Sequence, residues 1–78
     1  MNHKTMIRFK IVENGHILET SFDDRLSFKE NLTILSDICE EQISNARIYD
    51  PIKKIFLNED VPLSLFSFQY FVFLYLFT

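Results

Sequence analysis

The side chains of this sequence that could perform chemistry are two histidines, one cysteine and a pair of adjacent aspartates. They are His3, His16, Cys39 and the pair Asp23 and Asp24. A bound zinc ion needs several histidine or cysteine ligands at short spacing, and neither histidine has a second such ligand near it in the sequence. We therefore expect both histidines to be exposed to solvent, and we expect no bound metal and no cofactor.

The cysteine and the aspartates also have plainer structural roles. Cys39 lies next to Ile38 on the apolar stripe of a predicted helix. No base or cation is evidently paired with it, so a buried thiol is favoured over a nucleophile. Asp23 and Asp24 could hold a metal ion, but they precede a predicted helix, where negative charge is favourable. The single glycine excludes a glycine-rich phosphate loop. The sequence thus predicts no catalytic residue, no small-molecule substrate and no enzyme activity.

The composition is that of one small globular domain. The chain has 78 residues, 47% hydrophobic and 24% charged, with a formal net charge of −3. These values favour a folded domain and argue against a general binder of nucleic-acid phosphates. One cysteine cannot form an internal disulfide, and the N-terminus lacks the apolar run of a signal peptide. We expect a cytoplasmic protein with a loose N-terminus at residues 1–5 and a single domain at residues 6–78.

The predicted fold is organised around the apolar stretch 63–77, which therefore determines where an interaction surface can lie. It has the sequence LSLFSFQYFVFLYLF, without a formal charge and with five phenylalanines and two tyrosines. As a helix it would span about 22 Å, less than the ~30 Å hydrocarbon core of a bilayer, and aromatic residues favour strands. We predict a β-strand over residues 70–77, apolar on both sides and therefore in the middle of a sheet. The alternative is a membrane-associated protein whose segment 63–77 lies in or across a bilayer.

Two strands and a hairpin are predicted at the start of the chain. Apolar and polar residues alternate over residues 6–13 and again over 16–22, the period of half-buried strands. Between them stand Asn14 and Gly15, the commonest pair in a type I′ turn, because both positions must tolerate positive φ. The sequence therefore predicts an antiparallel hairpin with a type I′ turn.

A helix is predicted after the hairpin, beginning at Ser27 and ending near Ile43. Ser27 with Glu30 three residues later forms the capping-box pattern, and Ser44 with Asn45 offers a stop. The expected apolar stripe is formed by Phe28, Leu32, Leu35, Ile38 and Cys39. The opposite, solvent-facing side is expected to carry Glu30, Asn31, Thr33, Asp37, Glu40 and Glu41.

Two short strands complete the predicted order. They are expected at residues 46–49 and 54–57, separated by a bend at Asp50 and Pro51, because proline disfavours helix before it and cannot donate to a ladder. The order is β-β-α-β-β-β. It predicts an α+β fold in which a mixed sheet packs on one helix and the last strand runs parallel to the first.

This order resembles the β-grasp fold of the ubiquitin-like superfamily. The resemblance rests on the hairpin MIRFKIVENGHILETSF, the helix SFKENLTILSDICEE and the segment IFLNEDVPLSLFSFQ. Within the superfamily, the chain is most similar to the small YukD-like proteins encoded with Gram-positive type VII secretion systems. The resemblance implies a bacterial, non-catalytic protein-interaction module that is an accessory of a type VII-like secretion system.

Two positions depart from the superfamily. Ubiquitin-like modifiers and sulfur carriers end in a diglycine, whereas this chain ends Leu76-Phe77-Thr78, so we do not expect conjugation or sulfur transfer. Relatives also commonly carry a Gly-Asp turn before the last strand, where Phe71 and Val72 stand here.

The predicted strands place an aromatic strip on the outer face of the sheet. If Val72, Leu74 and Leu76 face the helix, the alternating residues of the last strand face outward, and the first strand adds Arg8, Lys10 and Val12 to that face. The expected interaction surface consists of Arg8, Lys10, Phe71, Phe73, Tyr75 and Phe77. Tyrosine and phenylalanine beside arginine are typical of interface hot spots. We expect a protein partner or self-association as a homodimer; the alternative is that residues 1–5 or the loop in the 50s cover this face.

Overall fold

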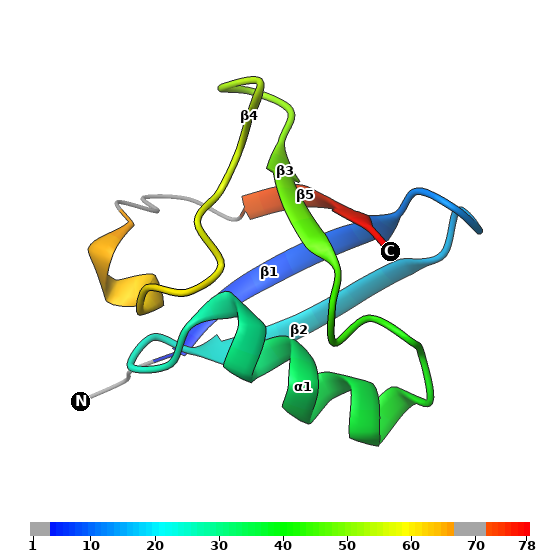
Figure 1. The fold of residues 1–78 in the computed structure, drawn as a ribbon, viewed down its shortest axis with the longest axis horizontal. Helices are drawn as coiled ribbons and strands as arrows, with labels where there is room; N and C mark the ends of the chain where they lie inside the picture. The colour runs from blue at the N-terminus through cyan, green and yellow to red at the C-terminus, as the bar shows by residue number, and fades with distance from the viewer. Residues whose placement is uncertain (1–3, 67–71) are drawn as a thin grey trace.

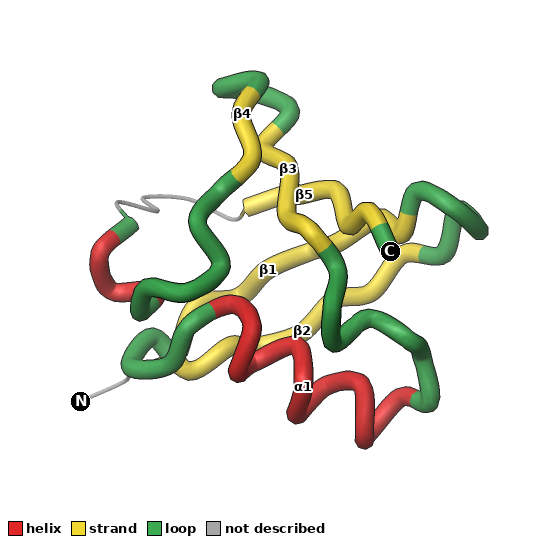
Figure 2. The backbone as a smooth tube through the Cα atoms, in the orientation of Figure 1, coloured by secondary structure: helices red, strands yellow, loops and turns green. Residues whose placement is uncertain are grey.

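The computed structural model describes residues 4–66 and 72–78 of the chain. Its elements follow the predicted order, with one added 3-10 helix (Figures 1 and 2). The elements are β1 (Lys4–Ile11), β2 (Ile17–Asp23), α1 (Phe28–Cys39), β3 (Arg47–Asp50), β4 (Ile55–Phe56), η1 (Leu63–Leu65) and β5 (Val72–Phe77). The predicted α+β class with a mixed sheet and one helix is confirmed.

The last strand is the centre of the sheet, as predicted. The strand order is β2-β1-β5-β3-β4. β5 pairs parallel with β1, where Phe9 lies opposite Leu74, and antiparallel with β3, where Ile48 lies opposite Leu76. Leu74 and Leu76 are fully buried, because a central strand has sheet on both flanks and the helix layer below it.

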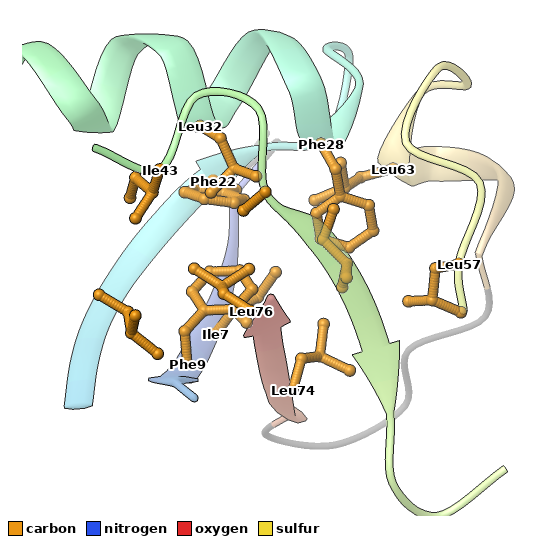
Figure 3. Packing of buried hydrophobic residues seen from close by; sticks show 13 residues of the cluster. Ile7, Phe9, Phe22, Phe28, Leu32, Ile43, Leu57, Leu63, Leu74 and Leu76 are labelled. Carbon is orange, nitrogen blue, oxygen red and sulfur yellow. The ribbon is translucent and has the colours of Figure 1, made fainter. Parts of the chain in front are cut away.

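The hydrophobic core lies between the inner face of the sheet and α1, which packs across that face (Figures 1 and 3). Three phenylalanines link the two layers: the rings of Phe9 and Phe22 are 5.2 Å apart, and those of Phe22 and Phe28 are 6.2 Å apart. The core consists of Ile7, Phe9, Ile11, Phe22, Phe28, Leu32, Ile43, Ala46, Ile48, Leu57, Leu63, Leu74 and Leu76.

The first hairpin is confirmed, but its turn is not type I′. Gly15 has a φ of +75°, whereas Asn14 is not among the residues with positive φ. Instead, the Gly15 N–H donates to the Ile11 carbonyl at 2.8 Å, and the His16 N–H donates to Asn14 Oδ1 at 2.9 Å. The turn is therefore a longer loop over residues 12–15, in which only the glycine adopts positive φ.

The boundaries of β1 and β3 differ from the predicted ones. β1 begins at Lys4, so Lys4 and Thr5 belong to the sheet and not to a loose N-terminus. The first short strand runs one residue later than predicted, because the backbone turns only after Asp50. Asp50 Oδ1 accepts the N–H groups of Ile52 and Lys53, at 2.9 and 3.2 Å, and so fixes this bend.

The start of α1 is confirmed and its end is corrected. The Ser27 hydroxyl accepts the Glu30 N–H at 3.1 Å, and the Glu30 carboxylate accepts the Ser27 N–H at 3.1 Å, which is the predicted capping box. The helix ends at Cys39, because Glu40 takes a left-handed conformation with φ 60°. Ile43 therefore lies in the returning loop, from which it reaches the core.

The helix faces are also corrected. Ile38, predicted on the core stripe, is 74% exposed. Asn31, predicted to face solvent, is only 5% exposed, and its amide Nδ2 donates to the Asp23 and Ser27 carbonyls at 3.0 and 2.9 Å. The helix is thus rotated so that a polar side chain lies at the end of β2, where backbone groups need partners.

Asp23 and Arg25 give the loop before α1 a pH-dependent contact. Arg25 Nη2 donates to Asp23 Oδ2 at 2.9 Å. Side-chain and backbone hydrogen bonds from Arg25 lower the pKa of Asp23 from 3.8 to about 2. Because the folded-state pKa is depressed, the contact stabilises the fold fully above pH 3.8, and its contribution is lost as the pH falls through about 2.

We expect Arg25→Ala to raise the pKa of Asp23 toward 3.8, but not fully, because the backbone N–H of residue 25 still donates to Asp23. An NMR titration of the side-chain carboxyl carbons measures this shift. Glu13 is the internal control, since hydrogen bonds from Thr78 lower its pKa independently. An Asp23 pKa that stays at about 2 in the variant would contradict the assignment to Arg25.

Candidate interaction surface

The outer face of the sheet brings together most of the residues predicted as an interaction surface. In the parallel pairing of β1 and β5, Arg8 lies opposite Phe73 and Lys10 lies opposite Tyr75. Phe77 follows on the same side of β5, because alternate residues of a strand point to the same face. The predicted member Phe71 lies outside the described residues.

The aromatic strip extends further than the sequence prediction, across three strands. Tyr49 of β3 stacks on Tyr75 with ring centroids 6.4 Å apart and contacts Phe77 edge-on at 6.1 Å. Phe56 of β4 lies 5.1 Å from Tyr49 and 5.6 Å from Phe77, and Phe73 lies 5.7 Å from Tyr75. We call these five residues, Tyr49, Phe56, Phe73, Tyr75 and Phe77, the aromatic face.

Sequence reasoning missed the contributions of β3 and β4. Alternation around the buried Ile48 could have placed Tyr49 and Arg47 on the outer face. Phe56 carried a weaker signal, since it stands beside Leu57 in a short apolar run and only the structure shows that Leu57 is the buried one.

The cations of this surface differ in how they are held. The guanidinium carbon of Arg47 lies 4.0 Å from the ring centroid of Phe56, a cation–π contact. Arg8 donates to Glu19 at 3.0 Å across the hairpin, so its charge is largely offset. Lys10 is exposed. The aromatic face is therefore bordered by positive charge on a chain whose net charge is −3.

The aromatic face is partly covered by its own rings. Phe73, Tyr75, Phe77 and Tyr49 are half-buried and Phe56 is exposed, because neighbouring rings cover one another's edges. Of the segments expected to cover this face, Lys4 and Thr5 lie within β1, and the 50s contribute Phe56 at the margin. On β1, the side chain of Met6 is also exposed.

The residues that could perform chemistry are dispersed. His16 is exposed and lies 2.9 Å from Glu41 through its Nδ1. Cys39 is half-buried against the core. Asp24 accepts a hydrogen bond from the Thr5 hydroxyl. Across residues 4–66 and 72–78, no three histidine, cysteine or acidic side chains gather as they would to hold a metal ion; His3 lies outside this part of the chain.

The apolar segment 63–77 is part of the fold wherever the structure describes it. Leu63 of η1 and the inward residues Leu74 and Leu76 of β5 belong to the core. Among the described residues, no helix has both the length and the apolar character that are needed to span a membrane.

Comparison with known proteins identifies the fold. No protein-family profile matches this sequence, and no curated protein matches it. A solved structure that is similar is the solution structure of the C-terminal ubiquitin-like domain of mouse tubulin-specific chaperone e. It superimposes with a TM-score of 0.69 over 96% of this chain and 86% of that chain, at 19% sequence identity. The chain therefore has the ubiquitin-like β-grasp fold that its sequence predicts.

Proposed function

We propose that this chain is a non-catalytic protein-interaction module that binds a protein partner, or a second copy of itself, through the aromatic face. The observation that carries the proposal is the continuous set of five outward rings on β3, β4 and β5, with Arg47 stacked on Phe56. Tyrosine, phenylalanine and arginine are enriched at protein interfaces, and tyrosine and arginine are frequent among the residues that carry most of the binding energy.

The continuity of the aromatic face supports a binding role. Large contiguous apolar patches are rarely left bare on monomeric proteins, and here five rings from three strands contact one another. Burying such a surface against a partner removes apolar area from water, at roughly 25 cal/mol per Å². The flanking cations Lys10 and Arg47 then determine which partner surfaces are electrostatically compatible.

The cellular role that we propose is that of an accessory component of a type VII-like secretion system in the bacterial cytoplasm. It is supported by the resemblance of the length, the N-terminal start and the helix of this chain to those of YukD-like proteins. A secretion ATPase gene or genes for small helical substrates beside the gene of this protein would support this role. If no such genes lie beside it, the secretion role would be contradicted, whereas the proposed binding through the aromatic face would be unaffected.

The alternative of a membrane-associated protein is disfavoured by the packing of β5. Insertion of segment 63–77 into lipid would remove Leu63, Leu74 and Leu76 from the core. The sheet would also lose its central strand, which joins the β2-β1 pair to the β3-β4 pair. A cooperative melt that survives removal of residues 63–78 would favour the membrane alternative instead.

The substitution Phe73→Asp tests the aromatic face directly. The substitution removes one ring of the aromatic face and puts a carboxylate beside Tyr75. A buried charge opposes the packing of this face against a partner, so we expect self-association or partner binding to weaken at least tenfold. Sedimentation and light scattering over a range of protein concentrations measure self-association, and calorimetry measures binding to an isolated partner. The matched control is Ile52→Asp, since Ile52 is 86% exposed and lies in the β3–β4 turn.

Both variants must keep the wild-type circular dichroism spectrum for the comparison to count. A wild-type chain that stays monomeric at millimolar concentration, with partner binding that is unchanged in Phe73→Asp, would contradict the assignment of binding to the aromatic face.

A further inference from the structure

The turn between β3 and β4 carries apolar and basic side chains that are all open to solvent. Residues 52–55 have the sequence IKKI, and each of them is exposed. Ile52 is 86% exposed, more than any other large hydrophobic residue among residues 4–66 and 72–78, and Ile55 is 49% exposed. We call residues 52–55 the basic tip. Figure 1 shows this turn at the top of the view, on the opposite side of the molecule from α1.

Backbone contacts with Asp50 hold the basic tip in one conformation. Asp50 Oδ1 accepts the N–H groups of Ile52 and Lys53, at 2.9 and 3.2 Å. The Asp50 carbonyl accepts the Lys54 N–H at 2.8 Å. Because the turn is fixed before any partner arrives, binding through it requires little further loss of conformational freedom.

Both lysines of the basic tip have charges that the described chain does not neutralise. Neither Lys53 nor Lys54 forms an ion pair within residues 4–66 and 72–78. Lys54 also has a φ of +61°, a left-handed conformation that favours glycine. Replacing Lys54 with glycine therefore removes a charge and relieves backbone strain at the same time.

The acidic side chains gather away from the basic tip. Residues 28–46, which comprise α1 and the loop after it, carry four acidic side chains and one lysine. Glu59, the first acidic residue after the basic tip, lies at the start of α1, where its carbonyl accepts the Lys29 N–H at 3.0 Å. A chain with a net charge of −3 thus still has a positive end. Such a separation of charge orients that end toward an anionic surface.

We propose that the basic tip binds the surface of an anionic lipid bilayer. Ile52 enters the boundary between headgroups and acyl chains, and Lys53 and Lys54 lie among the lipid phosphates. Burial of apolar area and attraction of lysines to anionic headgroups both strengthen such peripheral binding. Segment 63–77 takes no part, so β5 stays in the sheet. The site is also separate from the aromatic face, and it goes beyond the function proposed for that face.

A bilayer suits the basic tip better than a protein partner does. A stable protein interface uses about 20–30 residues on each side, whereas the basic tip consists of four residues at the end of a turn. A fluid bilayer receives a projecting apolar side chain without a matching pocket. The lysine stems can lie against the hydrocarbon while their ammonium groups stay at the headgroups.

The test uses the full chain with vesicles made of equal parts phosphatidylglycerol and phosphatidylcholine, and with vesicles of phosphatidylcholine alone. Sedimentation of the vesicles measures bound protein. We expect half of the protein to be bound at on the order of 1 mM anionic lipid, and binding at least tenfold weaker without phosphatidylglycerol. Spin-labelled lipid should broaden the NMR amide signals of residues 52–55 before all others.

Two variants separate the apolar and the electrostatic parts of the contact. Ile52→Asp should weaken vesicle binding at least tenfold, while it still serves as the control for the aromatic face in lipid-free solution. Lys54→Gly should weaken vesicle binding about fivefold, with a melting temperature at or above that of the wild type. Its matched control is Lys29→Gln, which gives the same net charge but changes an exposed lysine of α1, and which should stay within twofold of the wild type.

Each other outcome overturns the proposal. Equal loss of binding in Lys54→Gly and Lys29→Gln would mean that net charge, and not the basic tip, controls the contact. Broadening that begins at β5 would mean that the apolar C-terminal segment enters the lipid instead. Equal binding to both kinds of vesicle, or no binding at 10 mM lipid (on the order of ten times the expected midpoint), would mean that the basic tip does not recognise an anionic bilayer.

Discussion

Replacing Leu74 with alanine should lower the free energy of unfolding by about 2–5 kcal/mol. Leu74 is fully buried on β5, opposite Phe9 of β1, in the middle of the sheet. Truncation removes its methyl groups from the core and leaves a cavity that the two flanking strands prevent from collapsing. A domain of this size has a stability of about 4–12 kcal/mol, so this loss is a substantial fraction of the whole.

Urea denaturation followed by circular dichroism measures this loss, with an unchanged slope confirming that the same surface unfolds. The matched control is Leu65→Ala, because Leu65 belongs to the same apolar segment but is 69% exposed. It should change stability by no more than about 0.5 kcal/mol. Equal effects of the two substitutions would contradict a buried central strand. They would instead favour the alternative in which segment 63–77 lies in or across a bilayer.

The central strand could be predicted because its composition allows few other solutions. Residues 70–77 are uncharged and rich in aromatics, and even the longer segment 63–77 is too short to span a bilayer as a helix. Such a strand needs another strand on each side of it in the sheet. The capping box at Ser27 was equally clear, since both of its bonds depend on local spacing alone. The hairpin was clear from alternation, but its turn geometry was not, because a longer loop of residues 12–15 also satisfies Asn14 and Gly15.

The end and rotation of α1 could not be predicted from periodicity. Ile34, Ile38 and Ile43 all suit an amphipathic helix of that length, and only the left-handed Glu40 decides that the helix ends at Cys39. Once it ends there, Ile43 can reach the core from a loop, and Ile38 is left on the surface. The residue at which α1 ends depends on where β3 must begin, and that position is set by the pairing of the whole sheet.

The aromatic face was half predicted for a similar reason. Its β5 members follow from alternation within one strand. Tyr49 and Phe56 join it only because β3 and β4 extend the sheet beyond β5, on the side opposite β1. A surface formed by three strands requires the strand order, which the sequence supplies only through the resemblance to β-grasp proteins.

Replacing Asn31 with leucine should lower the free energy of unfolding by about 1–3 kcal/mol, although leucine is similar in size and more hydrophobic. The amide of Asn31 bonds to both backbone groups of Asp23 and to the Ser27 carbonyl. Leucine would leave the Asp23 N–H without its acceptor, whereas the Asp23 and Ser27 carbonyls keep the backbone N–H groups of Leu26 and residue 31 as donors. An unsatisfied buried polar group costs about 1–3 kcal/mol. The loss should therefore exceed any gain from added apolar area.

Chemical denaturation measures the change in stability, and hydrogen exchange at the Asp23 amide gives an independent readout, because that N–H loses its acceptor. Thr33→Ala is the control, since the Thr33 hydroxyl also bonds to a backbone carbonyl, that of Lys29, but on the exposed side of α1. It should leave the exchange rate of the Asp23 amide unchanged. A neutral or stabilising Asn31→Leu variant would mean that the end of β2 packs as ordinary core, and that its edge is closed by α1 itself and not by a single amide.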